Sequence, residues 1–372
     1  MDKILFTATE SQLHIEAFHL PYLKWFKEHG YEVHVATRRE KDIPYCDVLH
    51  DISFRRSPFR PENIQAYYKL KSIIDSNNYK LIHCHTPMGG VITRFSASRA
   101  RNKGTKILYT AHGFHFFKGA PLINWFLYYP VEKWLSKYTD CIITINEEDY
   151  GYAKSKGFKS KDVRLIDGVG VDLHKFNPIK DEDKKALREK YGYRQDDFIL
   201  IYVGELIYRK HQDYFFDIMD LMKNKIPRLR LLLVGNGSLM RSYADTVKKR
   251  DLDQYISFLG YRKDVPALMA LSDVAVSSSR QEGLPVNIME AMATGLPLVV
   301  SNCRGNRDLV RHHVNGFIFD LDDPEEFSSD IEQLFESEEL RKKISANSLK
   351  IVARYSLPVV LKEMEKIYEE YL

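Results

Sequence analysis

Two glutamates eight positions apart, Glu282 and Glu290, are placed to bind a ligand that carries both hydroxyl groups and phosphates. Glu282 stands in a loop, and Glu290 stands in a segment whose apolar residues recur at helical spacing. A carboxylate can accept two hydrogen bonds from a ribose diol, and the N–H groups at the start of a helix attract a diphosphate. We therefore expect Glu290 to hold a ribose and Glu282 to reach a sugar beyond the phosphates. The N–H groups expected at the phosphates lie near Leu284 to Asn287, and Gly283, Leu284 and Pro285 are the expected binding-site residues of this turn. The alternative is a solvated loop glutamate followed by a surface helix.

A strand, a loop, a helix and a second strand position these glutamates. The apolar run Val274–Val276 ends in three serines, which predicts a buried strand that leads into the loop. Pro285 suits the first helical turn, where its missing N–H needs no partner, and Gly295 marks the end of the helix. Pro297–Val300 is the next predicted strand. Parallel strands joined in this way bring their loops to the sheet edge at which open α/β sheets bind ligands.

The start of the chain predicts a second domain of the same kind. Lys3–Thr9 is a predicted strand, His14–His29 a predicted amphipathic helix ended by Gly30, and Glu32–Thr37 the next strand. The turn after the first strand contains no glycine. Because a nicotinamide dinucleotide site needs G-x-G-x-x-G in that turn, the sequence argues against an oxidoreductase.

Three histidines of this first half are candidate site residues. His85 and His112 stand where the predicted strands Lys80–Thr86 and Lys106–Gly113 end, and His14 stands near the start of the first helix. The carboxyl edge of a parallel sheet is the place where such side chains would meet a ligand. The alternative for each is a histidine that is packed for structural reasons.

At these residues the chain resembles a known family. EGLPVNIME, with RGNRDLV after the next strand, is similar to the retaining glycosyltransferases of family GT4, which have the GT-B fold. Four further segments resemble the bacterial capsule and exopolysaccharide members of that family: FHLPYLKWFKEHGYEVHVAT, IHCHTPMGG, YTAHGFHFFKGAP and GVGVDLHKF. The resemblance covers nearly the whole chain. It implies an α/β protein of two Rossmann-like parallel-sheet domains that face a central cleft. Residues 1–178, joined by the helix at 358–372, would bind the acceptor, and residues 179–357 would bind the nucleotide sugar.

The resemblance also assigns roles to individual residues. His112 matches the histidine that contacts the donor sugar or orients the reacting groups, and Lys210 matches the lysine that supplies positive charge to the pyrophosphate. Many members have an arginine directly after Gly204, where this chain has Glu205, so Arg209 is expected to compensate. The remaining positions expected around the nucleotide and the sugar, in the turns after the predicted strands, are Gly235, Arg262 and Asn306.

Composition and charge fit a soluble cytoplasmic protein. The 372 residues suffice for two domains, and the 44% hydrophobic and 28% charged content is that of a globular chain. The four cysteines show no C-x-x-C spacing, so neither a zinc site nor a disulfide framework is expected. MDKILFTATESQ turns polar too early for a signal peptide, and no apolar run is long enough to span a bilayer. A nucleic-acid partner is not expected, because the basic residues are dispersed and no known binding module is present.

Two aromatic stretches suggest that the protein binds at the inner face of the cell membrane. Residues 1–178 hold 26 Lys and Arg against 19 Asp and Glu, so this half is the one expected to face an anionic surface. Around residues 54–71, arginines and lysines alternate with aromatic residues, and residues 114–138 form the densest aromatic stretch. The second stretch is too interrupted to span a bilayer, and more apolar than a solvated helix. An interfacial patch or a groove for a lipid-linked acceptor is expected there, with core packing and solvated faces as the alternatives.

Taken with the resemblance, these features imply a hexosyltransferase. A hexose or N-acetylhexosamine would move, with retention, from a nucleoside-diphosphate sugar, with UDP as the expected nucleotide. The acceptor would be a saccharide on a polyprenyl diphosphate, in surface polysaccharide synthesis. No metal ion or other cofactor is expected, because cationic side chains and helix amides would replace the divalent ion. A sugar-nucleotide epimerase of the same fold and a catalytically silent sugar-nucleotide-binding protein are the alternatives.

Overall fold

The computed structural model covers residues 1–372 and describes every backbone position, together with all side chains except those of residues 11–13. The chain forms two compact units. Unit 1 comprises Met1–Gly170 and Pro358–Leu372, and unit 2 comprises Val171–Leu357. The first junction lies a few residues before the boundary expected after residue 178, and the C-terminal segment belongs to unit 1.

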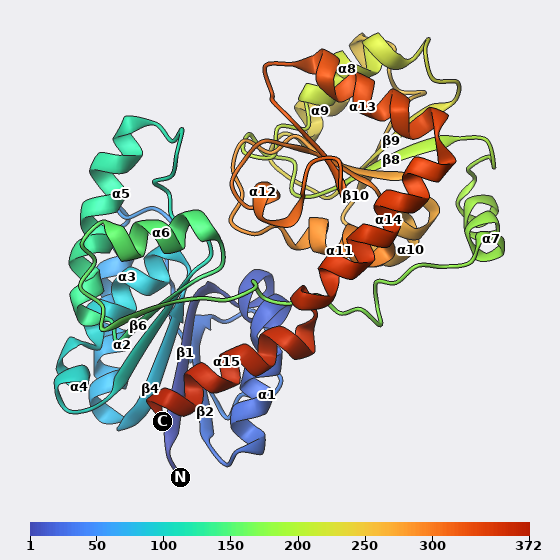
Figure 1. The fold of residues 1–372 in the computed structure, drawn as a ribbon. Helices are drawn as coiled ribbons and strands as arrows, with labels where there is room; N and C mark the ends of the chain where they lie inside the picture. The colour runs from blue at the N-terminus through green and yellow to red at the C-terminus, as the bar shows by residue number, and fades with distance from the viewer. The chain divides into compact units, whose positions relative to one another are not determined.

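Unit 1 is built on a seven-stranded sheet in the order β3-β2-β1-β4-β5-β6-β7, in which every neighbouring pair is parallel (Figure 1). Its central strands are almost entirely buried, because helices cover both faces of the sheet. The strands are β1 (Lys3–Glu10), β2 (Glu32–Arg38), β3 (Val48–Asp51), β4 (Tyr79–His85), β5 (Lys106–Ala111), β6 (Cys141–Thr144) and β7 (Asp162–Leu165). The helices are η1 (Ser11–His19), α1 (Leu20–Glu28), α2 (Glu62–Ser76), α3 (Pro87–Ser96), α4 (Ser98–Asn102), α5 (Leu122–Leu135), η2 (Ser136–Tyr138), α6 (Glu147–Ser155) and α15 (Leu357–Tyr371).

Unit 2 repeats this design with a six-stranded parallel sheet in the order β10-β9-β8-β11-β12-β13. The strands are β8 (Phe198–Val203), β9 (Leu229–Val234), β10 (Ile256–Gly260), β11 (Val274–Ser277), β12 (Leu298–Ser301) and β13 (Gly316–Phe319). The helices are α7 (Asp181–Tyr191), α8 (Tyr214–Met222), α9 (Met240–Lys249), α10 (Val265–Leu271), α11 (Val286–Thr294), α12 (Asn306–Leu309), α13 (Pro324–Glu336), α14 (Glu338–Val352) and η3 (Ala353–Tyr355). The α/β class with two parallel sheets is therefore confirmed.

The first helical segment differs from the single helix expected over His14–His29. A π-helix, η1, begins directly at the end of β1, and α1 starts only at Leu20. Pro21 explains the restart, because proline fits the first turn of a helix and not its interior. The wider turns of η1 place His14 and His19 beside the carboxyl end of the sheet.

Each sheet reverses its strand order once. In unit 1 the reversal lies between β1 and β4, and in unit 2 it lies between β8 and β11. At such a point the loops after the two adjacent strands turn in opposite directions and leave a crevice, in which open α/β sheets bind their ligands. His14, His85, Lys210 and Glu282 lie at these two positions, and His112, Gly235 and Asn306 follow the adjacent strands. Arg262 lies farther away, after the edge strand β10.

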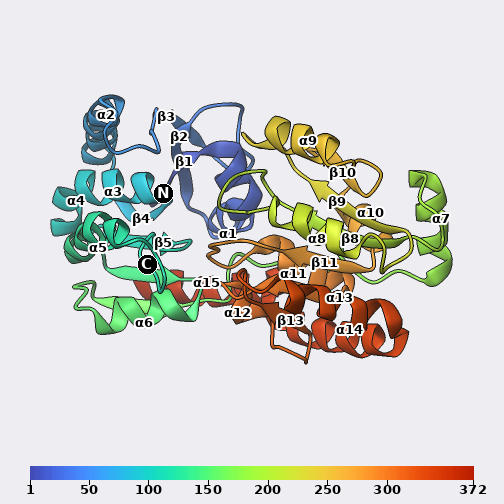
Figure 2. The ribbon, with the colours of Figure 1, turned by 90° about the horizontal axis from the view of Figure 1, so that it is seen from above.

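Two helices near the C-terminus brace these sheets. In unit 1, α15 lies against α1, where the ring of Tyr368 packs on Trp25 and Phe26 (Figure 1). In unit 2, α14 lies beside α11, the helix that carries Glu290 (Figures 1 and 2). Gly295 ends α11 in the left-handed conformation with a φ of 79°, as expected for the helix stop.

Candidate active site

Glu282 lies at the centre of a charged group at the reversal point of unit 2. The loop after β8 supplies Lys210, whose Nζ donates to Glu282 Oε1 at 2.5 Å, and Arg209, whose Nη1 donates to Glu282 Oε2 at 2.9 Å. The Ser279 hydroxyl, from the loop after β11, donates to the same Oε1 at 2.6 Å. The structure thus brings the adjacent residues Arg209 and Lys210 to Glu282, which lies more than seventy positions later in the chain.

Because Glu282 and Lys210 are buried, the charge of each is stabilised by the opposite charge beside it rather than by water. Glu282 and Lys210 are only 5% and 8% exposed, and Arg209 is partly exposed. Burial alone would raise the pKa of Glu282, yet the adjacent charges of Lys210 and Arg209 hold it below its usual value. Nε of the buried Arg304 also donates to the backbone oxygen of Glu282 at 2.9 Å. The carboxylate is therefore ionised and held in one orientation.

Glu290 lies on α11 in a different environment. Burial raises the pKa of its carboxyl group to about 7, an effect that the charge of Lys175 partly offsets. The first turn of α11 is fixed beside β8, because the Asn287 amide donates to the backbone oxygen of Val203 at 2.8 Å. The backbone of Leu284 and Pro285 leads into this first turn.

Glycines let the loops around this group approach closely. Gly235, after β9, has a φ of 145°, and a Cβ there would lie 2.1 Å from the backbone oxygen of Gly204. At Gly305 a Cβ would lie 2.5 Å from the backbone oxygen of Gly283. A side chain at either position would push these loops apart, so the two close backbone contacts require glycine.

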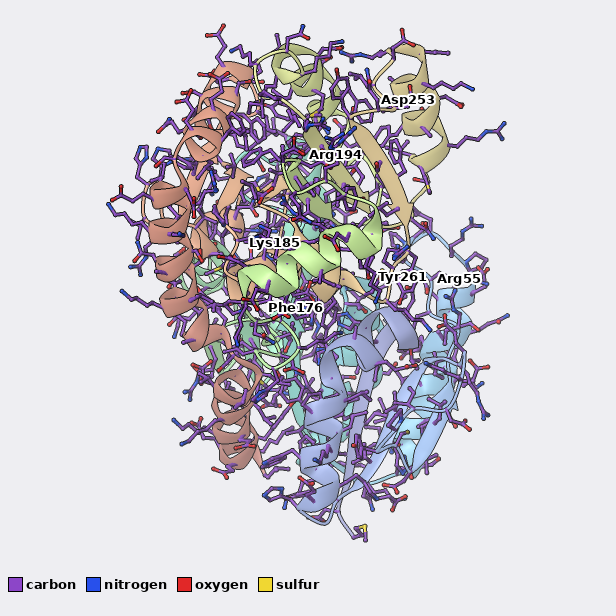
Figure 3. The ribbon with its side chains drawn as sticks, turned by 90° about the vertical axis from the view of Figure 1, so that its right-hand side faces the viewer. Arg55, Phe176, Lys185, Arg194, Asp253 and Tyr261 are labelled. Carbon is purple, nitrogen blue, oxygen red and sulfur yellow. The ribbon has the colours of Figure 1, made fainter. Side chains whose placement is uncertain are left out.

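The last two predicted residues of unit 2 are engaged by neighbouring protein groups. Asn306 is fully buried and its Nδ2 donates to the backbone oxygen of Ser301 at 3.0 Å, so its side chain holds the loop rather than facing outward. Arg262 forms a two-pronged ion pair with Asp264 at 2.8 and 2.5 Å, and this pairing lowers the pKa of Asp264. Tyr261, labelled in Figure 3 directly after β10, is 70% exposed at the same turn.

His112 lies in unit 1, immediately after β5. Burial lowers the pKa of its ring to about 4, so the imidazole is neutral at physiological pH. Its Nε2 lies 3.4 Å from Nδ1 of His85, the last residue of β4. Both line a pocket with Thr110 and Gly168. The two strand-end histidines are thus brought together, and the ring of His14 packs edge-on against His112 at 4.5 Å.

Comparisons with known proteins agree with this architecture. Residues 3–146 match the family described as glycosyl transferase 4-like, and residues 183–351 match glycosyl transferases group 1. A Bacillus subtilis (strain 168) protein described as putative glycosyltransferase EpsD is 46% identical over 370 residues, which cover 100% of this chain and 97% of the relative. The chain belongs to the GT4 family of glycosyltransferases.

This glycosyltransferase is also similar to other enzymes and to solved structures. An Escherichia coli enzyme described as UDP-Gal:alpha-D-GlcNAc-diphosphoundecaprenol alpha-1,3-galactosyltransferase is 28% identical over 84% of this chain and 80% of its own. The crystal structure of Anabaena Alr3699/HepE in complex with UDP and glucose has a TM-score of 0.81 at 20% identity and covers 100% of both chains. These matches show that the glycosyltransferase has the GT-B fold.

Two residues of the charged group were not predicted from the glycosyltransferase sequence. Ser279 is the third of the serines that end β11, and Arg304 opens the segment RGNRDLV. Both segments were recognised, but no role was given to these two side chains. Their contacts with Glu282 depend on how the loops after β11 and β12 fold back.

The aromatic stretch of the glycosyltransferase divides between two faces of α5. Trp125, Tyr128 and Tyr129 pack against the core of unit 1. The opposite face is exposed, with Phe126 at 75%; we call it the α5 apolar face, formed by Leu122, Ile123, Phe126, Leu127, Val131 and Trp134. Among the helices that the structure describes, none is both long enough and apolar enough to cross a bilayer.

Proposed function

We propose that this glycosyltransferase moves a hexose or N-acetylhexosamine from a UDP-sugar to a lipid-linked saccharide, with retention at the anomeric carbon and without a divalent ion at the diphosphate. The observation that carries this proposal is the buried group of Lys210, Arg209 and Glu282 beside the start of α11. It combines two cations for a diphosphate with a carboxylate for sugar hydroxyls at one point of the sheet edge.

The proposed role of Lys210 and Arg209 is to stabilise the negative charge that develops on the leaving diphosphate. Cleavage of the bond to the sugar increases negative charge on the diphosphate, and fixed cations in a buried site stabilise that change more than they stabilise the bound substrate. In the structure both cations are neutralised in part by Glu282. An arriving diphosphate competes with Glu282 for them, which frees the carboxylate oxygens to accept hydrogen bonds from the sugar.

Glu290 and His112 complete the proposed assignment. Glu290, on α11, accepts hydrogen bonds from the ribose diol, and His112, from unit 1, contacts the donor sugar. The relatives support the donor and acceptor classes: the E. coli enzyme is named for a UDP-Gal donor and a diphosphoundecaprenol-linked acceptor. A Campylobacter jejuni relative, 24% identical over 95% of this chain, is likewise named for a diphospho-undecaprenol-linked acceptor. The proposed site of action is the inner face of the membrane.

A donor panel tests this function. Purified protein is given UDP-, GDP- and dTDP-sugars with membrane lipid extract, and the release of free nucleotide is measured with and without added Mg²⁺ or Mn²⁺. We expect one UDP-sugar to be turned over without added ions, and an α-linked product from an α-linked donor by NMR. A strict requirement for Mg²⁺ or Mn²⁺, or a β-linked product, would contradict the proposal.

Lys210→Ala provides the matched variant for that assay. Loss of one charge that acts in the transition state lowers kcat by roughly 100-fold or more. Lys225→Ala is the control, because Lys225 is a surface lysine of unit 2 whose side chain pairs with Glu332. Release of nucleotide without any acceptor, together with a changed sugar, would instead indicate an epimerase.

A further inference from the structure

Four histidines meet at the reversal point of the unit 1 sheet. His14 and His19 come from η1, His85 ends β4, and His112 follows β5. We call them the histidine cluster. One ring nitrogen of each lies within 4.8 Å of a ring nitrogen of every other member. The rings of His19 and His85 are stacked at 3.8 Å, and those of His14 and His112 meet edge-on at 4.5 Å.

The ring nitrogens of this cluster lack the partners that buried polar atoms normally have. Nδ1 and Nε2 of His19, Nε2 of His85 and Nε2 of His14 are buried without a hydrogen-bond partner among the described residues. His19 and His85 are 2% and 0% exposed. A buried N–H or lone pair without a partner costs free energy, so three adjacent rings with such atoms require an explanation.

A neighbouring histidine shows what ordinary structural packing looks like here. His83, also on β4 and equally buried, uses both nitrogens: Nδ1 pairs with the Tyr368 hydroxyl and Nε2 with the Thr110 hydroxyl, each at 2.8 Å. The same sheet therefore satisfies a buried histidine fully where the histidine serves packing alone. The cluster differs from it, because four of its ring nitrogens have no hydrogen-bond partner among the described residues.

We propose that the histidine cluster is a binding site for a divalent transition-metal ion, with Zn²⁺ as the expected occupant. Four imidazole nitrogens are the ligands that suit Zn²⁺, whereas Mg²⁺ and Ca²⁺ prefer oxygen. Nitrogens bound to Zn²⁺ at about 2.0–2.1 Å in a tetrahedron lie roughly 3.4 Å apart. The Nε2 of His112 and the Nδ1 of His85 are already 3.4 Å apart. Rotation of the rings of His14 and His19 would bring one nitrogen of each to the same ion.

The surroundings of the cluster support this assignment. His19 and His85 are buried and His14 and His112 are partly buried, so the protein would shield a bound ion from most of the solvent. His19, His85 and His112 also line a small pocket together with Gly168. With four protein ligands the site is closed, as structural zinc sites are, so the ion would tie η1 to the ends of β4 and β5 rather than activate water.

The histidine cluster goes beyond the proposed function. It lies in unit 1, whereas the group proposed to bind the diphosphate lies in unit 2. The diphosphate-binding group consists of Lys210, Arg209 and Glu282, and it needs no ion from unit 1. Only His112 belongs to both proposals. If the protein binds Zn²⁺ but transfers no sugar, the metal site is supported and the proposed function is contradicted. If it transfers sugar but binds no Zn²⁺, the metal site is contradicted and the proposed function is supported.

Cobalt titration of the full chain tests the site. Protein stripped with a chelator is titrated with Co²⁺, and visible absorption is recorded before Zn²⁺ or Mg²⁺ is added. We expect the intense bands of tetrahedral Co²⁺ to saturate at one ion per chain, to disappear on addition of Zn²⁺ and to be unaffected by Mg²⁺. Only the weak bands of octahedral Co²⁺, or no saturable binding by the folded chain, would overturn the proposal.

Variants locate the ion. His112→Ala, at one of the two partly exposed members of the cluster, is expected to weaken Zn²⁺ binding by more than roughly 100-fold, because loss of a direct ligand costs at least as much as loss of a supporting contact. His83→Gln, the buried neighbour, and His174→Ala, an exposed histidine of unit 2, are expected to leave affinity unchanged. Circular dichroism checks that each variant is folded. Unchanged affinity in folded His112→Ala, or an equal loss in folded His174→Ala, would refute the assignment.

Discussion

At the scale of single residues, the ion pairs of Glu282 determine how much a substitution at this position lowers the stability of unit 2. Removing one member of a buried pair leaves the other charged without compensation, which costs about 3–5 kcal/mol. We therefore expect Glu282→Gln to lower the free energy of unfolding of unit 2 by about that amount, because Lys210 is only 8% exposed. Hydrogen exchange of peptides from β8 and β11 at increasing urea measures this loss.

A double variant separates pairing from packing at the same residues. If the cost comes from an uncompensated lysine, then Glu282→Gln combined with Lys210→Met should recover more than half of the lost stability. Arg209 needs no change, because it is partly exposed and water can solvate it. Strictly additive losses in the double variant would show that Lys210 and Glu282 are not energetically coupled.

Glu290 predicts a pH dependence for donor binding. Its pKa in the free protein is raised to about 7, so the carboxyl group is largely protonated at pH 6 and largely ionised at pH 8. A ribose diol donates two hydrogen bonds and thus favours the ionised form, so bound donor lowers this pKa. The affinity for UDP-glucose should then rise about tenfold from pH 6 to pH 8, as calorimetry can measure.

The conservative variant at the same position provides the control for that experiment. Glu290→Gln has no carboxyl group to titrate, so its weaker affinity should be nearly constant over the same range. Binding to the unchanged protein near pH 7 should also release protons, which calorimetry in buffers of different ionisation enthalpy detects. An equally steep pH profile in Glu290→Gln would assign the dependence to another group.

At the scale of elements, the α5 apolar face is a surface of unit 1 that we expect to bind lipid. The inner side of α5 is anchored by the buried ion pair between Glu132 and Arg94, at 2.9 Å, which keeps the opposite, α5 apolar face turned outward. Lys137 lies next to that face, with Nζ 4.5 Å from the Trp134 ring. Apolar side chains beside lysines suit an anionic lipid surface.

Phe126→Glu tests whether α5 binds lipid. Transfer of one phenylalanine side chain into the acyl boundary contributes about 1.5–3 kcal/mol, so the substitution should weaken co-sedimentation with phosphatidylglycerol vesicles at least about tenfold. UDP binding should not change. Leu221→Glu is the control, because Leu221 is an exposed residue of α8 in unit 2. Equal losses in both variants would show that the effect is not specific to α5.

The same elements show how far sequence patterns reach. The central strands and α11 were predicted because buried parallel strands are continuous apolar runs, and because Pro285 and Gly295 mark the two ends of that helix. The edge strands β3 and β13 were not predicted. Val48–Asp51 mixes apolar with polar residues, and Gly316–Phe319 is a short apolar run, which by itself does not distinguish a strand from a packed loop or helix segment. The division of the first helix into η1 and α1 was also missed, because an amphipathic period does not distinguish a π-helix from an α-helix.

At the scale of the whole molecule, what could be predicted of the site depended on distance along the chain. Glu282, Glu290 and the glycine turn stand within one segment, so their spacing carried the prediction. The pairing of Glu282 with Lys210 joins two loops that meet only because β8 and β11 are neighbours in the sheet. The histidine cluster likewise gathers residues from η1, β4 and β5, and no spacing reveals that arrangement.

The assignment of donor binding to unit 2 gives a prediction for the entire chain. UDP without a sugar should be held by the diphosphate-binding group and Glu290 alone, and at 100 times its Kd it stabilises the state that binds it by about 2.7 kcal/mol. Hydrogen exchange should therefore slow in peptides that span Gly204–Lys210, Ser279–Pro285 and α11. His112→Ala should leave this protection intact, because His112 lies in unit 1 and is assigned to the sugar, whereas Lys210→Ala should remove most of it. Protection confined to the ends of β4 and β5 would place the nucleotide in unit 1 and reverse the assignment of the two units.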